Sequence, residues 1–240
     1  MEKTAVSLFA GVGGFDLALQ KNNYKMIASV EIDKKCNEVL KKHFPDVKKY
    51  TDIKNVKGKD LIKDGFKAEN GIITGGFPCQ DLSIAGKRAG LAGERSGLFW
   101  EAHRILKETK SENFILENVP GLLSSNKGKD FGIILGSLVE LGYSVGWRVL
   151  DAQYFGIPQR RRRVFIVGSL TGTERIFKVL FERDSLSGNY KKSGKKRKEI
   201  TREIKESSGK SKNDTIGSLV LSDWKGPNNQ YVQANKLVVE

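Results

Sequence analysis

A chain of 240 residues, 38% of them hydrophobic, is long enough for one domain with a sizeable core, or for one domain with an appendage. Two cysteines, Cys36 and Cys79, are too few for a disulfide framework or a zinc cluster. The sequence contains no run of about 18 apolar residues, the length needed to cross a membrane. We therefore expect a cytoplasmic protein of a reducing compartment, without a bound metal. The net charge of +14 suggests a polyanionic partner, usually nucleic acid, although a solvated lysine-rich surface explains it equally well.

Up to residue 169 the sequence alternates short apolar runs, which favour strands, with segments that carry apolar residues at helical spacing. In chain order we expect strand 4–9, helix 16–22, strand 25–31, helix 33–43, strand 71–76, helix 98–109, strand 113–118, helix 131–141, strand 143–150 and strand 163–169. Strands separated by helices predict an α/β fold, with a mixed, mostly parallel Rossmann-like sheet that helices cover on both faces.

The composition changes after this point. Residues 189–212 hold ten Lys or Arg against three Glu and almost nothing apolar. Such a stretch buries too little surface to offset its loss of conformational entropy. We therefore expect one domain over 1–170, followed over 171–240 by an exposed basic linker and a short segment that is too small for a core of its own.

The first expected strand runs into the sequence FAGVGGFD, residues 9–16. A strand, then glycines, then a helix is typical of the nucleotide-binding turn of a doubly wound sheet, although a plain tight turn has the same pattern. The dinucleotide fingerprint needs a glycine where this chain has Asp16. A carboxylate is a poor neighbour for a pyrophosphate but is tolerable beside the amino group of an amino-acid ligand. This favours S-adenosylmethionine over a nicotinamide cofactor.

Two further acids follow at positions that suit a nucleoside ligand. Glu31 ends the second expected strand, where an acid accepts hydrogen bonds from both ribose hydroxyls in nucleotide-binding folds. Asp52 could end a third strand and hold the adenine amino group. The alternatives are a helix-capping acid and a surface acid, but the glycine turn and Glu31 together favour a nucleotide site.

The second cysteine, Cys79, follows the apolar strand 71–76 in the run GGFPCQ. A residue just past the carboxyl end of such a strand lies where doubly wound folds bind their ligands, and Pro78 stiffens the backbone before it. The glycine, proline and polar neighbours favour an exposed thiol. The alternative is a buried structural cysteine, which is the commoner fate of a lone cysteine. Cys36, within a helical pattern, is expected to be structural.

The stretch that follows, residues 83–97, combines glycines with cations. The cations are Lys87, Arg88 and Arg95. This composition fits a flexible loop that closes over phosphates, and it fits a plain surface loop equally well.

An acid and a cluster of arginines flank the last expected strands. Glu117 directly follows three apolar residues, so we expect it to be partly desolvated and suited to proton transfer, unless it faces solvent at the strand end. Arginines occupy positions 160–163 before the apolar run VFIV. Strand alternation sends Arg161 and Arg163 to one face, so this pair could reach a site, or could merely grip phosphate.

These motifs, in this order and rough spacing, resemble those of the DNA cytosine-5 methyltransferases over about residues 4–169. The motifs are Phe9-x-Gly11-x-Gly13-Gly14, Pro78-Cys79-Gln80, Glu117-Asn118-Val119 and Gln159-Arg160-Arg161-x-Arg163. The full run GGFPCQDLSIAG is similar to the DNA enzymes rather than to their tRNA-modifying relatives. The resemblance implies the fold of S-adenosylmethionine-dependent methyltransferases, S-adenosylmethionine as cofactor and double-stranded DNA as substrate.

The resemblance also implies a role for each matching residue. Cys79 is the nucleophile that adds to carbon 6 of a flipped cytosine, Glu117 hydrogen-bonds ring nitrogen 3, and Arg163, with Arg161 behind it, holds the carbonyl oxygen. The implied cofactor-binding residues are Phe9, Gly11, Gly13, Gly14, Glu31, Ile32, Asp52, Ile53, Pro78 and Leu98. The expected DNA-binding residues are Gln80, Ser83, Lys87, Arg88 and Arg95.

Family members continue into a target-recognition region and two further motifs, which are not found in residues 171–240. Within this range, the segment 214–240 resembles at most the start of an incomplete recognition region. We therefore expect a truncated enzyme or one half of a split enzyme whose second polypeptide carries the rest, in a restriction-modification or phage modification system. An inactive DNA-binding remnant is the alternative, motivated by the net charge of +14. A third hypothesis, a nicotinamide-dependent oxidoreductase, is supported by the glycine turn alone.

Overall fold

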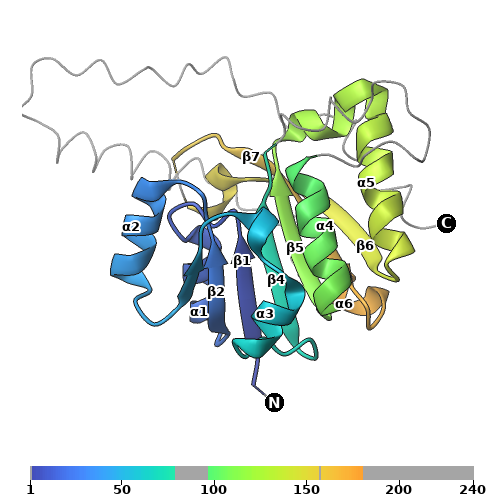
Figure 1. Ribbon diagram of the computed structural model, residues 1–240. Coiled ribbons are helices and arrows are strands. Elements are labelled where there is room, and N and C mark those ends of the chain that lie inside the picture. Colours follow the sequence, from blue (N-terminus) through green and yellow to red (C-terminus); the bar gives the residue numbers. More distant parts are fainter. Residues whose placement is uncertain (1, 79–96, 157, 181–240) are drawn as a thin grey trace, which may run out of the picture. The chain divides into compact units, whose positions relative to one another are not determined.

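The computed structural model describes residues 2–78, 97–156 and 158–180 (Figure 1). Its strands form one seven-stranded sheet in a layered α/β structure. The chain divides into two compact units, and all described strands and α-helices belong to the unit made of Met1–Ala152 and Arg160–Asn189. The strands are β1 (Thr4–Leu8), β2 (Lys25–Val30), β3 (Lys48–Tyr50), β4 (Gly71–Gly76), β5 (Asn113–Asn118), β6 (Ser144–Asp151) and β7 (Arg162–Ser169). The α-helices are α1 (Gly14–Lys21), α2 (Lys34–His43), α3 (Gly58–Lys63), α4 (Leu98–Thr109), α5 (Lys129–Glu140) and α6 (Thr173–Leu180).

The sheet has the strand order β3-β2-β1-β4-β5-β7-β6. The first five strands in this order pair in parallel, whereas β7 runs antiparallel to both β5 and β6. The expected α/β fold with a mixed, mostly parallel sheet is therefore confirmed. None of the described helices is long and apolar enough to cross a membrane.

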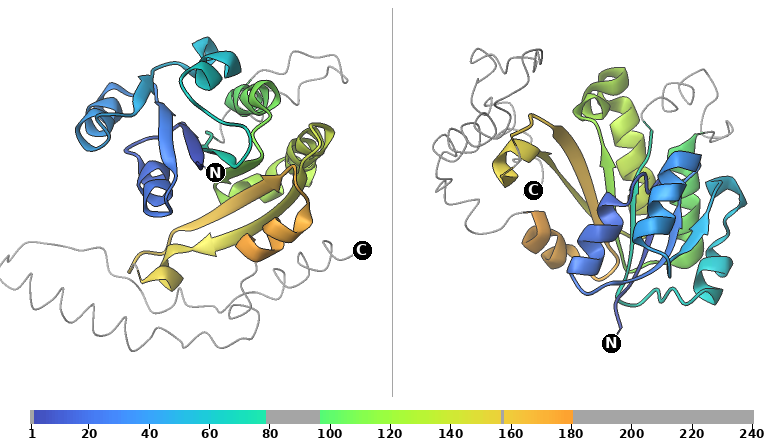
Figure 2. Two further views of the ribbon diagram at one scale, coloured as in Figure 1. Left: turned by 90° about the horizontal axis from the view of Figure 1, so that it is seen from below. Right: turned by 90° about the vertical axis from the view of Figure 1, so that its left-hand side faces the viewer.

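Helices cover both faces of the sheet, as Figure 2 shows in the view from below. On one face, apolar residues of α3, α4 and α5 pack on alternate residues of the central strands, such as Val6 and Leu8 of β1. On the other face, α1 and α2 pack over Ala5 and Met26, and α6 packs over Val167. The strands of the centre are buried on both sides, which explains their nearly continuous apolar sequences.

Two helices, α3 and α6, are absent from the expected elements because both are short, with six and eight residues. Helix α3 has six residues, of which only Gly58 and Leu61 are buried. Helix α6 buries Ile176 and Leu180, one turn apart. Both side chains lie over Gly146 of β6, where an added Cβ would be 2.6 Å from Ile176 and 3.0 Å from Leu180. The sheet, rather than local propensity, therefore determines where α6 packs.

Gly13, at the start of α1, is required by both conformation and packing. Its φ of +90° lies in the left-handed region, and an added Cβ would be 2.4 Å from the ring of the buried Phe44. We predict that Gly13→Ala lowers the free energy of unfolding by about 2–4 kcal/mol, from backbone strain and overpacking together. Thermal and urea unfolding measure this. The adjacent Gly14→Ala is the matched control, because an added Cβ there meets nothing within 4 Å, and equal losses in both variants would contradict the prediction.

Candidate active site

The residues expected to form a site follow the carboxyl ends of neighbouring parallel strands. The glycine turn follows β1, Glu31 follows β2, Asp52 comes two residues after β3, and Pro78 follows β4. Glu117 lies near the end of β5. Because parallel strands end at the same edge of the sheet, these five segments meet there, at the edge where such folds bind ligands.

Glu31 ties the glycine turn to the start of α2. Its Oε2 accepts a hydrogen bond from the Gly11 N–H at 2.7 Å, and its Oε1 accepts one from the Asp33 N–H at 2.8 Å. Each carboxylate oxygen has a second lone pair, so both can still accept a ribose hydroxyl. An added Cβ at Gly11 or Gly14 would meet nothing within 4 Å. The turn therefore leaves open space beside a fixed carboxylate.

Phe9 begins this turn in a conformation that is uncommon for a bulky residue. It is half-buried and its φ is +52°, in the left-handed region. β4 approaches closely here, because an added Cβ at Gly75 would lie 3.5 Å from the Phe9 ring. Backbone strain of this kind is found at ligand-binding turns, and the neighbouring Ile32 leaves 73% of its surface exposed at the same edge.

Asp16, which stands where the dinucleotide fingerprint has a glycine, is directed into the protein interior. Its side chain is fully buried and accepts a hydrogen bond from the Ser29 hydroxyl at 2.5 Å. Asp16 lies on the first turn of α1, and the helix packs this side against the sheet. The preference for S-adenosylmethionine over a nicotinamide cofactor therefore cannot rest on this carboxylate.

Ile53 is the first residue of the 3-10 turn η1 (Ile53–Asn55), and Asp52 directly precedes it as the capping residue. The Asp52 carboxylate accepts a hydrogen bond from the Lys54 N–H at 2.9 Å and so caps the turn. Ile53 is 4% exposed and packs into the main core. The core thus fixes the turn, and the capping bond uses one of the two Asp52 oxygens.

Glu117 and Arg163 form an ion pair at the same edge, with 2.6 Å between Glu117 Oε1 and Arg163 Nε. Glu117 pairs with Phe165 across β5 and β7, so Arg163, two residues before Phe165, is its diagonal neighbour on the same face. Both side chains are 22–23% exposed, as expected for a partly desolvated acid. The other oxygen, Oε2, would lie 2.8 Å from a Cβ added at Gly76, so a larger residue there would force this carboxylate to shift.

Asn118 contacts the backbone of Phe77, just past the end of β4, and the sequence did not predict this contact. Its side-chain amide donates to the Phe77 carbonyl at 2.9 Å, and its Oδ1 accepts from the Val119 N–H at 2.8 Å. Asn118 is 3% exposed. The sequence feature that could have pointed to a role for Asn118 is its place in the Glu117-Asn118-Val119 motif. The amide fixes the backbone two residues before Cys79.

Of the remaining expected site residues, the structure describes some and not others. Pro78 is exposed, and Leu98 is the half-buried first residue of α4. Arg161 precedes β7 with an exposed side chain, and its backbone N–H donates to Asp151 at 3.1 Å. The residues that lie outside the described part of the chain are Cys79, Gln80, Ser83, Lys87, Arg88 and Arg95.

The fold and the site together define a class of protein: a doubly wound domain with a glycine turn and an acid–arginine pair at the carboxyl edge of one sheet. The profile of the C-5 cytosine-specific DNA methylase family matches residues 4–236. The chain belongs to this family.

Individual relatives agree with this assignment. The Type II methyltransferase M.BsuFI of Bacillus subtilis is 40% identical over 165 residues, which are 69% of this chain and 39% of that protein. The Type II methyltransferase M.HpaII of Haemophilus parainfluenzae is 40% identical over 167 residues, which are 69% of this chain and 45% of that protein. The chain therefore spans less than half the length of these relatives.

The crystal structure of a mutant of Spodoptera frugiperda DNMT2 matches with a TM-score of 0.58 and 21% identity, over 72% of this chain and 51% of that one. S. pombe Dnmt2 methyltransferase matches with a TM-score of 0.56 and 22% identity, over 72% and 51%. Similarities at this level of identity concern the fold alone.

Proposed function

We propose that this protein transfers a methyl group from S-adenosylmethionine to carbon 5 of cytosine in double-stranded DNA, through a covalent adduct of Cys79. The observation that supports this best is the Glu117–Arg163 ion pair at 2.6 Å, on the same sheet edge as the Glu31-bound glycine turn. Family membership supports the reaction type.

The residues around the turn fit the methyl donor. Glu31 holds two backbone N–H groups and keeps a lone pair on each oxygen for the ribose, and Gly11 and Gly14 leave the turn open. Asp52 would accept from the adenine amino group, and Pro78 and Leu98 would lie beside the amino-acid part. When bound, the donor supplies a methyl group on a positively charged sulfur.

The protein's own groups would prepare cytosine to take that methyl group. The Cys79 thiolate adds to carbon 6, which moves electron density to carbon 5 and toward the ring nitrogen and carbonyl oxygen. Glu117 hydrogen-bonds nitrogen 3, and Arg163 stabilises the charge that develops at the oxygen. After methylation, a base removes the carbon 5 proton and the Cys79 thiolate leaves carbon 6, so the ring double bond and the free enzyme are restored.

Calorimetric binding of S-adenosylhomocysteine and transfer of labelled methyl groups to DNA test the proposal together. We expect binding at micromolar concentrations and transfer that requires cytosine. The absence of both would contradict the proposed function. Salt-dependent DNA binding without donor binding or transfer would instead identify an inactive DNA-binding remnant.

Replacing Glu31 by alanine is expected to weaken binding of S-adenosylhomocysteine by about 30- to 150-fold, since roughly 2–3 kcal/mol of hydrogen bonding to the ribose is lost. Transfer at saturating donor should fall much less, because Glu31 does not contact the base. Calorimetry and initial rates separate the two effects. Glu38→Ala, at an exposed glutamate of α2, is the control, and unchanged affinity in Glu31→Ala would remove this residue from the pocket.

We further propose that double-stranded DNA is the macromolecular partner, within a restriction-modification or phage modification system. The Type II names of the relatives in Bacillus and Haemophilus favour restriction-modification. The comparisons give no support to a second polypeptide, and the proposed function does not include one.

A further inference from the structure

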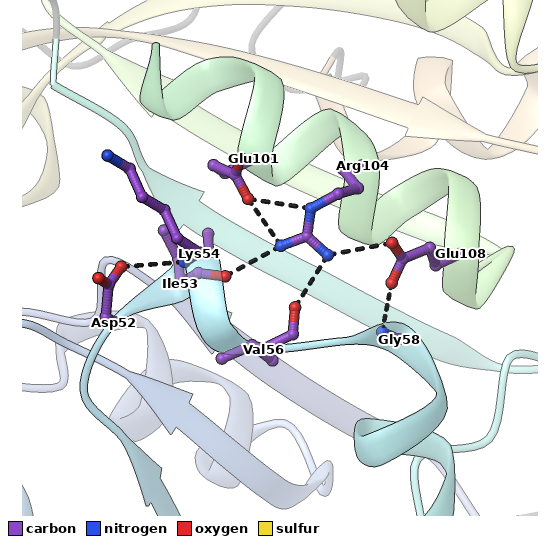
Figure 3. Close-up of polar contacts among 8 residues, drawn as sticks. All are labelled: Asp52, Ile53, Lys54, Val56, Gly58, Glu101, Arg104 and Glu108. Carbon is purple, nitrogen blue, oxygen red and sulfur yellow. Dashed lines mark hydrogen bonds and ion pairs between the residues drawn. The ribbon is translucent and has the colours of Figure 1, made fainter. Parts of the chain in front are cut away.

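The side chain of Arg104, on helix α4, lies across the turn that carries Asp52 and Ile53 (Figure 3). Its Nη2 donates to the Ile53 carbonyl at 3.0 Å, and its Nη1 donates to the Val56 carbonyl at 2.8 Å. These carbonyls belong to the first residue of η1 and to the residue just past its end. One guanidinium therefore holds both ends of the turn.

Two glutamates on the same helix complete the surroundings of the guanidinium (Figure 3). Glu101 Oε2 accepts from Nε at 2.9 Å and from Nη2 at 2.6 Å, and Glu108 Oε1 accepts from Nη1 at 3.0 Å. An arginine has five N–H donors. The five hydrogen bonds use one from Nε and two from each Nη. A lysine, with three donors on one atom, cannot reproduce this arrangement.

The guanidinium keeps its charge in this position. Partial burial lowers the pKa of Arg104, but the hydrogen bonds to Glu101 and Glu108 raise it above its ordinary value. Charged donors make stronger hydrogen bonds to carbonyls than neutral ones. The contacts to the turn are therefore worth more than ordinary surface hydrogen bonds.

Helix α4 also holds the segment that follows the turn. The second oxygen of Glu108 accepts a hydrogen bond from the N–H of Gly58, the first residue of α3, at 2.5 Å. Leu98 begins α4, and Arg104 lies less than two turns further on, roughly 9 Å along the axis. One helix therefore carries Leu98 and fixes the chain that carries Asp52.

We propose that Arg104 is a positioning residue for the adenine side of the methyl-donor pocket. It fixes the turn that carries Asp52 relative to helix α4, whose first residue, Leu98, belongs to the same pocket. This inference rests on the proposed function, which makes Asp52 and Leu98 pocket residues.

The test compares Arg104→Met and Arg104→Lys with the control Arg175→Met. Arg175 also pairs with a glutamate, Glu112. Glu112 directly precedes β5 and so lies at the opposite edge of the sheet from the site. Calorimetry measures the affinity for S-adenosylhomocysteine and for 5′-methylthioadenosine, which lacks the amino-acid part. Hydrogen exchange of the segment 50–58 measures the order of the turn.

Arg104→Met is expected to weaken both ligands by about tenfold, as the loss of one strong hydrogen bond would, and to speed exchange in 50–58. Arg104→Lys is expected to weaken both by about threefold, because one charged contact survives. Arg175→Met should lower the melting temperature and leave both affinities unchanged.

Unchanged affinities in a folded Arg104→Met protein would overturn the inference, as would a loss confined to S-adenosylhomocysteine. Should Arg104→Met fail to fold, unchanged affinities in Arg104→Lys would overturn it equally. If the unmodified protein binds neither ligand, the proposed function fails instead, and exchange in 50–58 still shows separately whether Arg104 holds the turn.

Discussion

Replacing Cys79 by serine is expected to lower the rate of methyl transfer to DNA by at least about a thousandfold. A thiolate adds readily to the electron-poor carbon 6 of cytosine, whereas a serine hydroxyl stays protonated and is a far weaker nucleophile. The affinity for S-adenosylhomocysteine should be nearly unchanged, because the proposed mechanism has Cys79 attack the base and not the donor. Initial rates with labelled donor and calorimetry measure the two quantities.

A covalent adduct gives a second readout of the role of Cys79. DNA that contains 5-fluorocytosine has no proton at carbon 5 to be lost, so the adduct should accumulate in the unmodified protein and not in Cys79→Ser. Cys36→Ser is the matched control, since Cys36 lies on α2 and should leave both rate and adduct intact. A rate for Cys79→Ser within tenfold of the unmodified protein would contradict the mechanism.

Glu117→Gln is expected to lower the transfer rate by about a hundredfold to ten-thousandfold, the usual range for loss of a positioned acid. Glutamine keeps the size of the side chain but removes the negative charge that pairs with Arg163 at 2.6 Å. It also removes the group that would hold a proton at nitrogen 3. Single-turnover rates at saturating donor measure the effect, and donor affinity should stay within about twofold, since the proposed mechanism has Glu117 contact the base and not the donor.

Glu112→Gln is the matched control, because Glu112 precedes the same strand at its other end and pairs with Arg175. Burial raises the pKa of Glu112, but the hydrogen bonds from Asn70 N–H and Arg175, with the charge of Arg175, lower it more, to below its ordinary value. Its contribution to stability is thus present at neutral pH and is lost as the pH falls through the lowered pKa. Glu112→Gln should lower stability at pH 7 but not the transfer rate. A similar loss of rate in both variants would show that Glu117 acts only through stability.

Much of the fold could be predicted because its elements are encoded by short local patterns. The strands 71–76 and 113–118 and the helix 98–109 have the same bounds in the sequence prediction and in the structure. Each is bounded by residues that end regular structure, and each carries a clear apolar pattern. Helices α3 and α6 were missed because each, at six and eight residues, is too short for a helical pattern to stand out over a window of about 11 residues.

The placement of Glu31 was also predictable, because a residue that ends a parallel strand must lie at the carboxyl edge of the sheet. The surroundings of Asp16 could not be predicted in this way, because it lies on helix α1 and not at the end of a strand. Whether a residue on the first turn of a helix faces the ligand or the sheet depends on how the helix packs, and here Ser29 of β2 takes the carboxylate at 2.5 Å. Local sequence does not contain that information.

By itself, then, the sequence determined the order of elements, the strand ends at which chemistry collects, and the family motifs of this protein. The tertiary structure decided which side chains meet: the antiparallel β7 brings Arg163 to Glu117, Asn118 reaches the Phe77 carbonyl, and Arg104 reaches the turn after β3. These partners are far apart in the chain. Their contacts depend on strand order, register and helix packing, which are set only when the whole core forms.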